Sequence, residues 1–82
     1  MSYVLRSEST GDLSGYDGPG PLFQGSTMVF PDFSQATAYT NDGNPKWADF
    51  QVVPTSLLNP LGPNVVYMRA NTDGTFTASW PS

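Results

Sequence analysis

The sequence predicts an all-β fold, a small antiparallel sheet or barrel of four to five short strands in hairpins with an extended N-terminal arm. From residue 26 onward, short runs of β-branched and aromatic residues alternate with turn signals, whereas residues 1–25 carry few apolar side chains. Eight glycines and eight prolines among 82 residues favour turns over long helices. We therefore divide the chain into an interaction arm, residues 1–25, and a β-rich body, residues 26–82.

The arm begins with a short apolar run and continues through a stretch rich in Gly, Pro and Ser, which favours neither a helix nor a long strand. Such a segment buries too little surface to offset the entropy lost on ordering, so we expect a partner to order it. Apolar side chains near its two ends suit recognition by addition to a sheet edge. The predicted partner-binding residues are Tyr3, Leu5, Tyr16, Leu22 and Phe23 in the arm and Trp47 in the body.

The first half of the body is predicted to contain a strand and a hairpin. Residues 27–30 form the strand, which Pro31 ends, and residues 32–38 form one helical turn or an irregular loop. Residues 37–40 and 47–53 flank a loop with an Asp-Gly pair, which favours a hairpin. Phe50 and Val52 alternate with polar residues, as in a half-buried strand.

The second half of the body contains the clearest local signal. After a Pro-rich connection, residues 65–70 and 75–80 are two β-prone runs separated by Asn-Thr-Asp-Gly, which predicts a hairpin with a left-handed glycine at position 74. Phe76, Ala78 and Trp80 share one face of the last strand, so we expect that face to be buried.

The side-chain inventory argues against catalysis and metal binding. The chain has no histidine and no cysteine, which removes the neutral-pH general base, the thiolate nucleophile and the common zinc ligands. A hydrolase with paired carboxylates is the mechanism left formally open, but most carboxylates sit beside Gly or Ser, in turn-like sequence. Residues 41–44 lack the spaced ligands of a calcium loop. We predict no enzymatic activity, no catalytic residue, no metal and no cofactor.

Charge and apolar patterning narrow the class of partner. The net charge of −4 comes without a basic cluster, so we expect neither nucleic acid nor an anionic membrane surface as a partner. No apolar run reaches the ~20 residues of a spanning helix, and the N-terminus lacks the pattern of a signal peptide. Without disulfides, a core this small needs support from a partner or from self-association, so we expect a homo-oligomer or lattice.

The chain resembles small bacteriophage virion proteins, particularly capsid cement or decoration proteins, in size, in its content of Gly, Pro, Thr and Asn, and in its lack of cysteine. The resemblance covers no defined motif and assigns no residue a role. It implies a non-enzymatic structural component, made in the host cytoplasm and carried in the virion. Its protein partner would be a major shell subunit or copies of itself, bound through the arm and the β body.

Two alternatives remain open. One is a carbohydrate-binding module of a fibre or surface protein, because aromatic residues stack on sugar rings. Its best candidate contact is Trp47, which lies beside Lys46 and near a turn, whereas Trp80 is expected in the core. A small protein inhibitor is the other, because acidity and small size are compatible with it.

Overall fold

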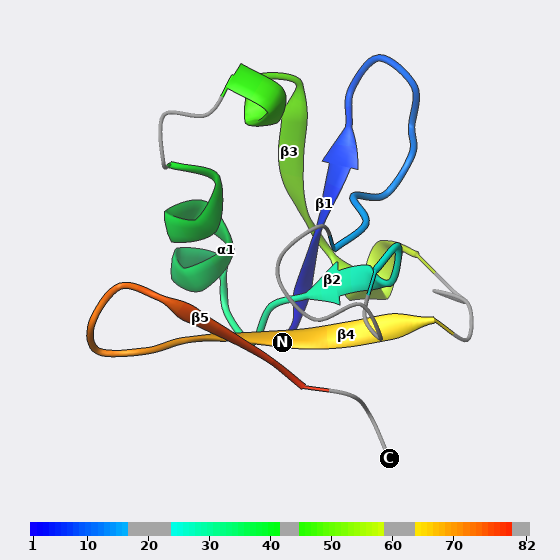
Figure 1. The fold of residues 1–82 in the computed structure, drawn as a ribbon. Coiled ribbons are helices and arrows are strands. Elements are labelled where there is room, and N and C mark those ends of the chain that lie inside the picture. Colours follow the sequence, from blue (N-terminus) through cyan, green and yellow to red (C-terminus); the bar gives the residue numbers. More distant parts are fainter. Residues whose placement is uncertain (17–23, 42–44, 59–63, 80–82) are drawn as a thin grey trace.

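The computed structural model describes residues 1–16, 24–41, 45–58 and 64–79. Figure 1 shows that these residues form two small sheets that run in clearly different directions, with a helix beside them. The elements are the strands β1 (Tyr3–Ser7), β2 (Thr27–Val29), β3 (Phe50–Pro54), β4 (Val65–Ala70) and β5 (Phe76–Ser79), the helix α1 (Phe33–Thr40), and the 3-10 turns η2 (Pro45–Trp47) and η3 (Thr55–Leu57).

The strands form one sheet of two strands and one of three. β1 pairs antiparallel with β3, while the second sheet has the order β2-β4-β5, with β2 parallel and β5 antiparallel to β4. Neither sheet closes on itself. The prediction of a small, predominantly β fold is therefore confirmed. The barrel alternative is wrong, and so is the expectation of purely antiparallel pairing, because β2 runs parallel to β4.

Residues 12–16 connect the two sheets by backbone hydrogen bonds. On one side the Ser14 N–H donates to the Leu5 carbonyl at 2.9 Å, and on the other the Tyr16 N–H donates to the Ser26 carbonyl at 2.8 Å. Tyr3 and Phe30 add a reciprocal pair of bonds, at 2.9 and 2.8 Å. Hydrogen bonds thus run from β3 through β1 and residues 12–16 to β2, β4 and β5.

The division into an arm and a body needs correction for the described part of residues 1–25. β1 lies within a sheet, and the side chains of Val4 and Leu5 are fully buried. The partner strand β3 lies 43 to 51 residues further along the chain, since Ser7 is opposite Phe50 and Tyr3 is opposite Pro54. β3 gives β1 the hydrogen bonds and the burial that its own sequence neighbours do not provide. Residues 17–23 lie outside the described residues.

The predicted hairpin of residues 37–40 and 47–53 is also wrong. Residues 37–40 are the end of α1, and Trp47 lies in η2. Asp32 caps α1, because its Oδ1 accepts a hydrogen bond of 2.8 Å from the Gln35 N–H. With the first half of the expected hairpin helical, β3 pairs with β1 instead.

The hairpin of β4 and β5 is confirmed over its described residues. Gly74 ends the turn with φ +90°, the left-handed conformation expected there. Phe76 and Ala78 are half-buried and pack on the core, whereas Thr77 and Ser79 are exposed. Trp80 lies outside the described residues.

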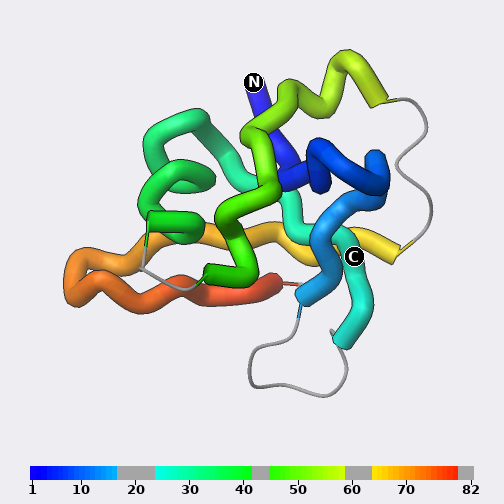
Figure 2. Tube along the Cα trace, turned by 90° about the horizontal axis from the view of Figure 1, so that it is seen from above, coloured from blue at the N-terminus to red at the C-terminus, as the bar shows by residue number. Residues whose placement is uncertain are grey.

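The core lies between the two sheets and α1, and Figure 2 shows α1 above the β4–β5 hairpin. Its aromatic members meet edge to face or tilted, as in the pair of Phe30 and Tyr39, 5.3 Å apart, and that of Tyr39 and Phe76, 5.0 Å apart. The buried cluster consists of Leu5, Tyr16, Met28, Phe30, Ala36, Trp47, Val66 and Met68.

Candidate functional site

Three of the predicted partner-binding residues belong to the core cluster. Leu5 is 0 % exposed, and Tyr16 and Trp47 are each 7 % exposed. Tyr3 is half-buried, with its ring 5.7 Å from that of Phe33 in an edge-to-face contact. The structure thus brings Leu5, Tyr16 and Trp47 together inside the protein, where their side chains pack on this chain's own residues. Leu22 and Phe23 lie outside the described residues.

Trp47 does not present a free ring face to a sugar. Its ring meets Tyr39 at 5.5 Å and Phe50 at 5.4 Å, and the Lys46 ammonium lies 4.7 Å from the ring centroid. These contacts explain the burial of a side chain that sits next to a turn in the sequence. Burial of Trp47 removes the contact on which the carbohydrate alternative first rested.

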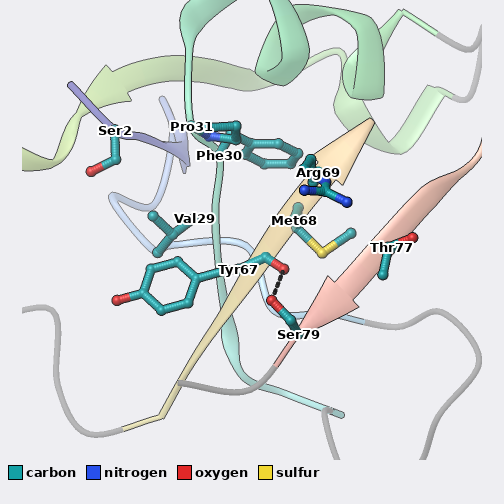
Figure 3. Close-up of a pocket in the computed structure, with 9 residues that line it drawn as sticks. All are labelled: Ser2, Val29, Phe30, Pro31, Tyr67, Met68, Arg69, Thr77 and Ser79. Atoms are coloured by element: carbon teal, nitrogen blue, oxygen red, sulfur yellow. Dashed lines mark hydrogen bonds between the residues drawn. The ribbon is translucent and has the colours of Figure 1, made fainter. Parts of the chain in front are cut away.

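A pocket of about 370 Å³ lies on the face of the three-stranded sheet that points away from the core (Figure 3). Tyr67 and Arg69, two residues apart on β4, are both exposed on this face, and Tyr67 is 46 % exposed. The pocket, called here the outer-face pocket, is lined by Ser2, Val29, Phe30, Pro31, Tyr67, Met68, Arg69, Thr77 and Ser79.

Strand register sets the order of these groups across the sheet. Val29 of β2 and Ser79 of β5 lie on either side of Tyr67, and Thr77 lies opposite Arg69. The Ser79 hydroxyl donates a long hydrogen bond, 3.4 Å, to the Tyr67 carbonyl (Figure 3). The pocket therefore combines an apolar side with an exposed phenol ring, a guanidinium group and two hydroxyl groups.

β5 forms one edge of the sheet within the described residues. The Asn71 N–H donates to the Thr75 carbonyl at 2.8 Å, so residues 71 and 75 form a hydrogen-bonded pair. Along an antiparallel ladder, hydrogen-bonded pairs alternate with non-hydrogen-bonded pairs. Phe76 and Ala78 therefore belong to non-hydrogen-bonded pairs, and their backbone N–H and C=O groups point away from β4. This edge can accept a further strand.

Three described carboxylates have pKa values below their usual range, each because of local hydrogen bonds. The pKa of Asp32 is lowered first by the Gln35 N–H and then by the Ser34 hydroxyl. That of Asp49 is lowered by the hydroxyl groups of Ser7 and Ser9, and that of Asp73 by the hydroxyl and N–H of Thr75. The bonds of Asp32 cap α1, those of Asp49 hold the loop after β1 in place, and those of Asp73 stabilise the turn between β4 and β5.

The described residues do not assemble the carboxylates into a metal site. Among them, no group of three acidic side chains could hold a metal ion. A general acid at neutral pH needs a raised pKa, and the three shifts go the other way. The chemistry that the outer-face pocket can offer is binding through an aromatic ring, a cation and hydroxyl groups.

Neither Tyr67 nor Arg69 is among the partner-binding residues predicted from the sequence. A signal was present in the alternation of residues 65–70, which places positions 67 and 69 on one face of a predicted strand. The opposite face of that strand goes to the core, through Val66 and Met68. Alternation alone does not distinguish a binding face from an ordinary solvated one.

Comparison with known proteins finds no matching family model, no matching curated protein and no matching solved structure. Across the part of the chain that the structure describes, no helix has the length and apolar character needed to cross a bilayer.

Proposed function

We propose that this chain is a non-enzymatic structural component of a large assembly, a bacteriophage virion protein of the capsid cement or decoration type. The observation that carries the proposal is the open edge of β5 beside the outer-face pocket. A row of backbone groups at a sheet edge, next to an exposed aromatic side chain, is the surface that a neighbouring protein can extend by β-addition. The partner is a major shell subunit or another copy of this chain.

The described structure changes how we expect the contact to be made. Leu5, Tyr16 and Trp47 are buried in the core and contribute to folding, so we expect the binding surface on the β4–β5 hairpin rather than on the N-terminal segment. Tyr67 becomes the expected aromatic anchor, because tyrosine is enriched at the energetic centres of interfaces. Leu57, 72 % exposed in η3, lies outside the pocket and provides a control.

The test is the native mass of the untagged chain from its natural source, measured by sedimentation. Movement with a particle of megadalton mass at fixed stoichiometry supports the proposal. Recovery as a free monomer or small oligomer contradicts it. In the same assay, Tyr67→Ala should lower incorporation and Leu57→Ala should not.

Carbohydrate binding is a second candidate, now for a different reason. The exposed ring of Tyr67 has the Thr77 and Ser79 hydroxyls on the same sheet face, and aromatic rings with nearby hydrogen-bonding groups suit sugars. A glycan array separates the two candidates. Binding that disappears with Tyr67→Ala but persists with Trp47→Phe would favour a module of a fibre or surface protein.

A further inference from the structure

Arg69 differs from the other basic residues in having no intramolecular partner in the described part of the chain. The Arg6 Nε donates to the Gly11 carbonyl at 3.4 Å, and the Lys46 ammonium lies over the Trp47 ring at 4.7 Å. Within the described residues, no hydrogen bond, ion pair or ring contact engages the Arg69 guanidinium.

Arg69 also dominates the charge of the outer-face pocket. Of the described residues that line it, Arg69 alone is charged; the others are apolar or carry hydroxyl groups. The chain as a whole has a net charge of −4, so this cation stands out against an acidic molecule. Charge complementarity therefore favours an anionic partner at this pocket.

We infer that the outer-face pocket binds an acidic, extended peptide segment of a neighbouring subunit, with a carboxylate on Arg69 and its backbone along the free edge of β5. The inference rests on the proposed function and names the chemistry of the partner. Guanidinium groups pair with carboxylates in a planar, two-bond geometry. The backbone groups of Phe76 and Ala78, which point away from β4, supply the edge.

The distances across the sheet are compatible with both contacts. Thr77 lies opposite Arg69, so an added strand would lie beyond Thr77, two strand spacings or about 10 Å from β4. An arginine and a glutamate on the same face bridge this distance between them, because long side chains reach past the directly opposite neighbour. The small Thr77 and Ser79 side chains lie between them on β5.

The experiment is an NMR titration of the full chain with a blocked eight-residue peptide of alternating valine and threonine that has one central glutamate. The matched probe has glutamine in place of the glutamate. We expect the amide signals of Phe76 and Ala78 to shift and the glutamate peptide to bind about fivefold more tightly. Arg69→Gln should abolish this preference, and Arg6→Gln, the matched control, should retain it.

Several outcomes would overturn the inference. Equal affinity for the two peptides, no binding, or the same loss in Arg6→Gln would show that Arg69 does not select a carboxylate. Shifts of the same amides by an oligosaccharide of uronic acids, with no response to peptide, would assign the pocket to an acidic glycan. Concentration-dependent shifts without any peptide would assign the edge to a second copy.

Sedimentation of the wild-type and Arg69→Gln chains from the natural source separates this inference from the proposed function. If both the wild-type and the Arg69→Gln chains move with the particle in equal amounts, the assembly role stands and the acidic-segment inference fails. If the wild-type chain does not move with a particle, the assembly role fails, whatever the peptide titration shows.

Discussion

The Gln35 side chain of α1 accepts a hydrogen bond of 2.6 Å from the backbone N–H of Ala70 in β4. β2 pairs with β4 only as far as Tyr67, so Ala70 has no strand neighbour on that side. Gln35 takes the place of the missing strand residue, and its amide nitrogen also donates to the Asp32 carboxylate at 3.2 Å. One side chain thus connects the start of α1 to the three-stranded sheet.

Replacing Gln35 should therefore destabilise the fold. We expect Gln35→Ala to lower the free energy of unfolding by about 1–3 kcal/mol, because the Ala70 N–H is left without its acceptor. Urea unfolding measures the change. Gln51→Ala is the control: Gln51 bonds Glu8 in exposed positions, and its loss should cost less than about 0.5 kcal/mol. Equal effects of the two substitutions would contradict the role given to Gln35.

Trp47 should matter for stability more than for binding. Its burial against Tyr39 and Phe50 predicts that Trp47→Ala lowers the free energy of unfolding by about 3–5 kcal/mol, while Trp47→Phe retains most of the contact. Thermal unfolding followed by circular dichroism tests this prediction. A stable Trp47→Ala chain would show that the ring is not part of the core.

The first strand should be indispensable for folding. Because Leu5 is fully buried and β1 is the strand neighbour of β3, a chain that lacks residues 1–7 should lose the two-stranded sheet and unfold. Leu5→Ala should cost about 2–5 kcal/mol, and Leu57→Ala, at an exposed position, less than about 0.5 kcal/mol. Hydrogen exchange that is unchanged in β3 after the truncation would refute this account.

Acid should destabilise the protein below about pH 4. The folded-state pKa of Asp49 is lowered by the Ser7 and Ser9 hydroxyls, so its contribution to stability is present above the unfolded-state pKa and is lost as the pH falls through the lower, folded-state value. Asp32 and Asp73 act in the same direction. Urea unfolding at several pH values should show a shallower acid loss in Asp49→Asn, and parallel curves would contradict the assignment.

The local signals in the sequence predicted part of the fold correctly. Residues 27–30 and the β4–β5 hairpin were identified because a strand and its turn are encoded within about 15 residues, and the left-handed Gly74 follows from the Asp-Gly pair. Helix α1 had a usable signal in Asp32 and Gln35, three residues apart, which is the spacing of a helix cap with its partner. The helix has only eight residues, and only Ala36 among them is buried, so no apolar periodicity marked it as a helix.

The sequence by itself determined the β-rich class, the absence of histidine and cysteine, the acidic charge and the β4–β5 hairpin, since all of these depend on composition or on neighbours along the chain. Only the tertiary structure decided that Tyr3–Ser7 pairs with Phe50–Pro54, that Trp47 is buried, and that Tyr67 and Arg69 share an open pocket. Contacts between distant segments depend on which surfaces fit together after the loops between them close. A local sequence pattern does not specify which distant segment a strand or side chain will contact.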